Sequence, residues 1–262
     1  IYPPLNKHIY KNNYGNLSIP FSKNAAVKDL NTALLKSQYG INWALPLQNL
    51  CPPVPGRLDY LLHTDELKKK RNLRILDIGT GANLIYPILA VCHFGWESIA
   101  SEIQTNSLAH AKKIISANSI LSSVVLREQK NKVHIFKDII FDSDNIDVVV
   151  CNPPFFRNAQ EAQKQNFRKV KNLKLSAKDP QNFAGESNEL WYKGGEEAFI
   201  KKIINESQFY QKQIHWFTSL VSNQDHLRTL KKAIQKLNPK EIKITNMDQG
   251  NKKSRFIAWT FR

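Results

Sequence analysis

The residues with the clearest chemical potential follow a short apolar run in the middle of the chain. Residues 148–150 are valines, Cys151 follows, and the run stops at Asn152-Pro153-Pro154. The valines predict a buried parallel strand, and the prolines must end it because proline lacks the N–H group that a sheet ladder needs. Proline also biases the preceding residue towards an extended backbone. Asn152 should therefore be held rigidly at the carboxyl end of the strand, where open α/β sheets bind ligands.

A rigid amide followed by flat side chains can bind a planar group that carries an amino function. The side-chain oxygen of Asn152 and the carbonyl of Pro153 can accept both hydrogens of such an amine, which favours a pyramidal nitrogen and frees its lone pair. Phe155 can stack on the planar group, and Phe156 can do the same or pack in the core. The same residues also fit a strand that simply ends in a Pro-Pro turn, and the rest of the chain distinguishes the two.

The composition restricts the class of protein. The chain has 262 residues, 42% of them hydrophobic, and a net charge of +16. Such a positive excess is typical of polyanion binders, and no helix has the basic and bulky apolar faces that favour a membrane surface, so nucleic acid is the expected partner. No apolar run approaches the roughly 20 residues of a membrane span, and the N-terminus lacks a signal-peptide pattern. Three scattered cysteines argue against a zinc site or a disulfide framework and favour the cytoplasm.

A second group of residues predicts a nucleotide-type site upstream. Residues 74–78 form a predicted strand, and Gly79-Thr80-Gly81-Ala82-Asn83 lead from it into a helix. Glycines allow a ligand to approach the backbone closely, and the free N–H groups at the helix start face it. A predicted strand over 96–102 ends in Glu102, about 20 residues past the turn, where an acid meets a ribose diol in dinucleotide folds. A further predicted strand, over 133–138, ends in Asp138.

The remaining pattern completes an α/β domain. A helix starting at Gly194-Gly195-Glu196, a strand over 215–221 and a helix over 224–237 precede two final strands joined by a basic turn. Strands that alternate with helices predict a doubly wound, mostly parallel sheet, and the last two strands predict an antiparallel hairpin. We expect this Rossmann-like domain to cover residues 72–262.

Residues 1–71 are expected to form a small helical extension. Helices are predicted from Asn24 to about Tyr39 and from Leu58 to the basic run 68–71, with a non-helical connector over 51–57. The first 22 residues mix cations and aromatic rings, which suits an arm that contacts RNA or a loosely packed leader.

A basic segment over 157–193 leaves directly from the proposed site. It has many cations, few acids and few apolar residues, so we expect it to clamp RNA; the alternative is a disordered loop whose charge only aids solubility. The cations expected to contact RNA are Lys164, Arg168, Lys169, Lys171 and Lys174, together with Lys252, Lys253 and Arg255 near the last turn.

The glycine turn separates two kinds of nucleotide fold. A dinucleotide fingerprint requires a third glycine, but position 84 is Leu. A two-glycine turn suits a nucleoside with a small charged tail, and S-adenosylmethionine has adenine, ribose and an amino-acid tail. A closing antiparallel hairpin also suits a class I methyltransferase better than a dehydrogenase.

Several motifs carry a resemblance to a known family. Residues 77–81 resemble the S-adenosylmethionine loop of class I methyltransferases, and Asn152-Pro153-Pro154-Phe155 resembles the catalytic motif of amino-group N-methyltransferases. Residues 55–60 and 194–199, and Gln249-Gly250 with Arg255 and Trp259, narrow the match. Together they resemble the bacterial 23S ribosomal RNA adenine-N6 methyltransferases of the RlmF type and the related eukaryotic U6 small nuclear RNA enzymes. Phe155 departs from the wider class, in which many members have Tyr, so no phenol can act here.

The resemblance implies S-adenosylmethionine-dependent methylation of N6 of a specific adenine in 23S ribosomal RNA, by a cytoplasmic, metal-free monomer. The expected catalytic residues are Asn152, Pro153, Pro154 and Phe155. The glycine turn should line the methionine tail, Glu102 should hold the ribose, Asp138 should meet the cofactor adenine, and Arg57 should pair with the cofactor carboxylate. The full set of expected cofactor-binding residues is Arg57, Asp77, Gly79, Gly81, Ala82, Asn83, Glu102, Asp138 and Asn152.

Two other functions fit parts of the sequence. Protein-glutamine N5 methylation uses the same amide-binding chemistry but needs no large basic surface. A catalytically inactive RNA-binding module would need neither Asn152 nor the glycine turn, and both are intact.

Overall fold

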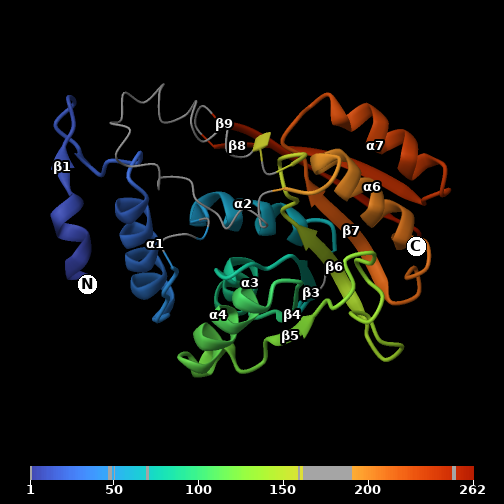
Figure 1. Cartoon of the computed structure of the whole chain (residues 1–262), viewed down its shortest axis with the longest axis horizontal. Coiled ribbons are helices and arrows are strands. Elements are labelled where there is room, and N and C mark those ends of the chain that lie inside the picture. Colours follow the sequence, from blue (N-terminus) through green and yellow to red (C-terminus); the bar gives the residue numbers. More distant parts are fainter. Residues whose placement is uncertain are drawn as a thin grey trace.

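The computed structural model describes residues 2–46, 49, 51–68, 71–158, 160–161, 191–249 and 252–262. Five cations of the predicted RNA clamp therefore lie outside the described residues: Lys164, Arg168, Lys169, Lys171 and Lys174. Of Lys252 and Lys253, only the backbone is described. The described part contains a seven-stranded sheet covered by helices on both faces, with the N-terminal segment at one end of the molecule (Figure 1).

The strand order of the sheet is β5-β4-β3-β6-β7-β9-β8. The first five strands in this order, β5, β4, β3, β6 and β7, are mutually parallel, and β9 is antiparallel to both of its neighbours. The structure thus confirms the mostly parallel sheet with a closing antiparallel hairpin. The bounds are β3 Arg74–Ile78, β4 Glu97–Glu102, β5 Val125–Glu128, β6 Ile146–Cys151, β7 Ile214–Leu220, β8 Glu241–Gln249 and β9 Lys252–Thr260.

The strand order reverses between β3 and β6. From β3 the chain proceeds outwards through β4 and β5, then returns to place β6 on the other side of β3. The ladder pairs Ile78 with Cys151, the last residues of these two strands. Because each predicted motif directly follows one of these residues, the glycine turn and Asn152 emerge side by side at the carboxyl edge, where ligands bind in such sheets.

Alternate residues of β6 face two different layers of helices. Val148 and Val150 pack in a core with α2, α3 and α4, whereas Val149 and Cys151 pack with α6 and α7. Burial on both faces explains why the strand is a continuous apolar run. The helix bounds are α2 Val54–Asp65, α3 Ile85–Phe94, α4 Thr105–Ser116, α6 Gly195–Ser207 and α7 His226–Gln235, with a 3₁₀ turn η2 over Ser119–Leu121.

The N-terminal segment is more ordered than its composition suggested. It consists of a 3₁₀ helix η1 (Pro3–His8), a short hairpin of β1 (Tyr10–Lys11) and β2 (Leu17–Ser18), and helix α1 (Asn24–Tyr39). Helix α1 ends at Gly40, which has a left-handed φ of 69°, and this confirms the predicted helix and its end. His8 Nε2 lies 3.0 Å from the Asp29 carboxylate and joins η1 to α1.

Helix α2 shares the core of the sheet, although its sequence position placed it in the extension. Tyr60 is fully buried, and its hydroxyl lies 2.5 Å from the Thr218 hydroxyl of β7 and 3.5 Å from the N–H of Cys151. The predicted non-helical connector is wrong from Val54 onwards, because α2 begins there. Proline is tolerated in the first turn of a helix, so Pro55 does not delay the start.

The predicted strand over 133–138 is also wrong, because these residues form turns and the edge strand is β5. The backbone N–H groups of Ile135 and Phe136 donate to the Glu206 carboxylate at 2.9 and 3.0 Å. Those N–H groups therefore take no part in a ladder, although the apolar alternation of the segment is typical of a strand.

Candidate active site

The glycine turn after β3 is held by the end of the neighbouring strand β4. The N–H groups of Gly79 and Thr80 both donate to the Ser101 carbonyl at 3.0 Å. Gly79 and Gly81 have φ values of 71° and 62°, a left-handed conformation that other residues adopt only at a cost. A side chain at Gly79 would meet no atom within 4 Å, so the backbone there is open to a ligand.

Glu102 braces this turn. One of its oxygens accepts the Gly81 N–H at 2.8 Å, and the other accepts the N–H groups of Ile103 and Gln104 at 2.7 and 2.9 Å. The carboxylate is buried and lies at the carboxyl end of β4, where the ribose role was predicted. Glu102 thus couples the shape of the turn to the start of α4, and the ribose contact stays a prediction.

Ala82 and Asn83 complete the turn. Ala82 is buried. The side-chain oxygen of Asn83 accepts the Ile85 N–H at 3.0 Å, and its backbone carbonyl accepts the Trp43 indole N–H at 2.8 Å. Asn83 therefore supports the first turn of α3, and its predicted bond to the cofactor stays a prediction.

Asp77 lies under the turn as a buried carboxyl. Within the part of the chain that the structure describes, neither of its oxygens has a hydrogen-bond partner, and the same holds for the Thr80 hydroxyl. Burial raises the pKa of Asp77 to about 7, and the charge of Glu102 adds to the rise, while the Arg57 charge opposes it. A buried acid without a partner beside an open backbone turn fits a ligand that brings a positive charge.

Asn152 receives its orientation from Arg57. An Nη1–H group of Arg57 donates to the Asn152 side-chain oxygen at 3.0 Å, and Nη1 also donates to the Tyr86 hydroxyl at 3.0 Å. Because arginine only donates hydrogen bonds, the oxygen of the amide must face it. Arg57 lies in the first turn of α2, which Tyr60 anchors to the strands, so the helix positions the guanidinium at the end of β6.

Sequence reasoning did not identify Tyr86. It lies in an apolar run of α3 and is buried, so its residue type gave no functional signal. Burial raises its pKa, and the nearby Arg57 charge opposes the rise. The ring also lies 5.5 Å from the Arg57 guanidinium carbon, which makes Tyr86 the second contact that fixes Arg57.

The aromatic residues after the prolines differ in their surroundings. Pro153 is buried, whereas Phe155 is 37% exposed and available to a ligand. Phe156 is half-buried and forms a bridge with Trp191, and its carbonyl accepts the Tyr192 N–H at 2.9 Å. This placement favours Phe155 for stacking and Phe156 for packing.

Asp138 lies in the turns between β5 and β6. It is exposed, with a φ of 65°. Burial raises the pKa of Tyr210, and the charges of Glu206 and Asp138 add to this rise, so Asp138 lies near Tyr210. Among the described residues no hydrogen bond or ion pair connects Asp138 with the glycine turn or Asn152, and its contact with the cofactor adenine stays a prediction.

Arg255, a predicted RNA contact, packs into the loop after β7. It is 9% exposed and its guanidinium donates to the Ser222 carbonyl at 3.0 Å. Glu196, also buried, accepts the Ser222 N–H at 2.6 Å and lies 2.8 Å from the His226 ring. The two motif residues thus brace the loop after β7, and RNA contact by Arg255 stays a prediction.

The described residues contain no helix long and apolar enough to cross a membrane. The same residues show no cluster of three metal-ligating side chains.

Four features together define a class I methyltransferase. They are the order of the strands in the sheet, the antiparallel strand β9 inserted between β7 and β8, the glycine turn braced by Glu102, and the Asn-Pro-Pro motif beside that turn. The comparisons agree. The chain belongs to a family described as RNA methyltransferase, whose model matches residues 1–262.

Individual relatives are similar over nearly the whole chain. The ribosomal RNA large subunit methyltransferase F of Saccharophagus degradans is 44% identical, and the alignment covers 100% of this chain and 89% of the relative. That of Christiangramia forsetii is 42% identical, with coverage of 99% and 93%. These matches confirm the family resemblance noted in the sequence.

Solved structures have the same fold. The hMettl16 catalytic domain in complex with MAT2A 3′UTR hairpin 6 has a TM-score of 0.85 and 30% identity, covering 100% of this chain and 90% of that one. The N-terminal domain of human METTL16 in complex with SAH has a TM-score of 0.79 and 26% identity, with coverage of 100% and 91%. The predicted fold class is therefore confirmed.

Proposed function

We propose that this protein transfers a methyl group from S-adenosylmethionine to the N6 amino group of a specific adenine in 23S ribosomal RNA, in the cytoplasm. The pairing of Ile78 with Cys151 carries the proposal, because it sets the glycine turn directly beside Asn152. The relatives named ribosomal RNA large subunit methyltransferase F support the choice of ribosomal RNA.

The residues around the turn suit this cofactor. The methionine ammonium group would compensate the charge of Asp77, and the open backbone at Gly79 would admit the tail, which Gly81 would help to line. Glu102 would hold the ribose hydroxyls, and Arg57 would attract the cofactor carboxylate. When bound, the cofactor supplies a methyl group that is already activated by the adjacent sulfonium charge.

The chain itself has mainly to orient the amine. The N6 nitrogen of adenine is a weak nucleophile because its lone pair is delocalised into the ring. Hydrogen bonds from N6 to the Asn152 oxygen and the Pro153 carbonyl would favour a pyramidal nitrogen with its lone pair directed at the methyl group. Phe155 would stack on the base after it has left any RNA stack. The nitrogen can lose its proton after transfer, so a strong general base is not required.

A transfer assay tests the proposal. Purified protein, methyl-labelled S-adenosylmethionine and 23S ribosomal RNA from cells that lack this protein should give labelled N6-methyladenosine after nucleoside digestion. RNA from cells that contain the protein is the matched control and should accept little label. Label on a glutamine-bearing protein, or none on RNA, would contradict the proposal.

Cofactor binding should also release a proton from Asp77. The pKa of about 7 leaves this carboxyl mostly protonated at pH 6 in the free protein, and a neighbouring ammonium group would lower that pKa. Calorimetric titration at pH 6 in two buffers of different ionisation enthalpy should show release of most of a proton, and Asp77→Asn should show none.

The same group affects stability in a defined direction. The unfolded chain loses this proton near pH 3.8 and the folded protein near pH 7. The folded state thus binds more protons between these values, and the stability of the free protein should fall as pH rises from about 4 to 7. Asp77→Asn should lack this component of the fall, and an identical pH profile for both proteins would refute the assignment.

A further inference from the structure

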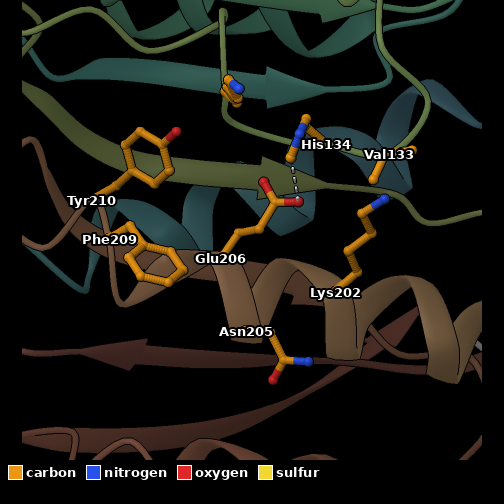
Figure 2. A pocket seen from close by; sticks show the side chains of 8 residues that line it. Val133, His134, Lys202, Asn205, Glu206, Phe209 and Tyr210 are labelled. Atoms are coloured by element: carbon orange, nitrogen blue, oxygen red, sulfur yellow. Dashed lines mark ion pairs between the residues drawn. The ribbon is translucent and has the colours of Figure 1, made fainter.

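A groove lies outside the proposed active site, between α6 and the turns over 133–137. Its volume is about 410 Å³, which lies within the roughly 300–1,000 Å³ of ligand pockets. In Figure 2, Phe209 and Tyr210 lie at one end, Lys202 and Val133 at the other, and Glu206 and His134 between them. The lining thus combines aromatic and cationic side chains.

The aromatic end presents one rigid ring and one projecting ring. Tyr210 packs against the buried Phe136 ring, with centroids 5.3 Å apart. Phe209 is 73% exposed, so its ring contributes little to the core and remains available for stacking. An exposed aromatic side chain of this kind is the usual platform for an unpaired nucleobase.

The cationic end is fixed in place. The Lys202 ammonium donates to the Lys132 carbonyl at 3.1 Å and lies 6.0 Å from the centre of the Tyr192 ring. An ammonium group has three donors, so others remain for a ligand. Lys137, which also lines the groove, is exposed, and among the described residues neither it nor Lys202 forms an ion pair with a carboxylate.

Among the described residues that line the groove, Glu206 is the one acid, and the protein itself binds it. The Glu206 carboxylate accepts the N–H groups of Ile135 and Phe136 and lies 3.9 Å from Nδ1 of His134. Its charge is therefore directed at the backbone of the turn, and the groove retains the positive character of Lys137 and Lys202. This positive charge complements the phosphates of RNA and would repel a basic peptide.

A chain of contacts joins the groove to the proposed active site. Lys202 lies beside Tyr192, whose N–H donates to the Phe156 carbonyl at 2.9 Å, and Phe156 directly follows Phe155. A strand of RNA that delivers its target base to Phe155 can thus continue along Tyr192 and Lys202 to Phe209.

We propose that this groove binds an unpaired nucleotide of the RNA substrate a few positions away from the target adenine, with its base stacked on Phe209 and the neighbouring phosphates bound by Lys137 and Lys202. The proposal rests on RNA being the substrate, as proposed above. The groove would add affinity for the RNA substrate and fix the direction in which the RNA strand crosses the protein.

Direct RNA binding, measured in the Asn152→Ala background, tests the groove. Phe209→Ala should weaken binding of a 23S ribosomal RNA fragment about tenfold, because one stacked base contributes about that much. Lys137→Gln and Lys202→Gln should each reduce the slope of log K against log salt by about 0.7. Ile120→Ala, at another exposed apolar side chain, and Lys112→Gln, on the outer face of α4, are the matched controls and should bind RNA as the parent does.

The outcomes separate this proposal from its alternatives. Unchanged RNA affinity and salt slope would overturn it. Normal binding of naked RNA by Phe209→Ala, with weaker binding of ribosomal particles, would also overturn it, in favour of a protein partner. Because binding in this background requires no methyl transfer, a failure of the proposed reaction would leave these measurements interpretable. S-adenosylmethionine affinity equal to that of the parent would show that Phe209→Ala is folded.

Discussion

Replacing Asn152 with alanine should lower the rate of methyl transfer to RNA by at least about a hundredfold, the usual loss when one directed hydrogen bond to the reacting group is removed. The amide oxygen lies at the end of β6, where Arg57 holds it at 3.0 Å. Alanine removes the acceptor for an N6 hydrogen, so the nitrogen lone pair stays in the adenine ring. The glycine turn and Glu102 are untouched, and cofactor affinity should change little.

Single-turnover transfer and calorimetric binding of S-adenosylmethionine measure the two effects separately. Asn145→Ala is a matched control, because Asn145 is exposed and directly precedes the other end of β6, and it should retain full activity. Asn152→Asp keeps an acceptor oxygen and should retain more activity than alanine. If Asn152→Ala transferred methyl groups at a third of the normal rate or faster, the proposed hydrogen bond from N6 to Asn152 would be wrong.

The sequence predicted those parts of the fold whose signal is local. Strand β6 was recognisable because both of its faces are buried and its residues are β-branched. Helix α1 was recognisable from its period and its terminal glycine. Strand β5 is a short edge strand with two exposed residues, and it gave no comparable signal. The turns at 133–138 were mistaken for a strand because the acid that binds their N–H groups, Glu206, is about 70 positions away in the sequence.

In the candidate site, too, the features with a local sequence signal could be predicted and the long-range contacts could not. Motifs that follow β3 and β6 could be predicted to meet, because the carboxyl ends of parallel strands lie at one edge. The contact between Arg57 and Asn152 joins residues 95 positions apart, and the participation of Tyr86 depends on helix packing, so neither could be derived from local pattern. The burial of Arg255 could not be derived either, because residue type does not report burial: a basic residue near a basic turn can equally bind backbone carbonyls.

Glu102 carries the second large expected effect, because its two oxygens hold three backbone N–H groups of Gly81, Ile103 and Gln104. Glu102→Gln keeps the shape of the side chain but leaves it only one oxygen. At least one of these N–H groups would then face an amide NH₂. Hydrogen bonds to a charged acceptor contribute about 1.5–3 kcal/mol each. We therefore expect a loss of about 2 kcal/mol in the free energy of unfolding, measured by urea denaturation, and a cofactor affinity about thirtyfold lower.

A deoxyribose cofactor analogue separates the ribose contact from the bracing of the turn. If Glu102 binds the ribose hydroxyls, the 2′-deoxy analogue should bind the parent more weakly than S-adenosylmethionine, but bind Glu102→Gln with little further loss, because interacting groups are not additive. Glu128→Gln is the matched control, since Glu128 is exposed and pairs with Glu102 on the neighbouring strand; it should change neither stability nor affinity. If the losses of affinity caused by Glu102→Gln and by the 2′-deoxy analogue added in full, Glu102 would act only through the turn. The missing hydroxyl and the missing charge would then affect binding independently.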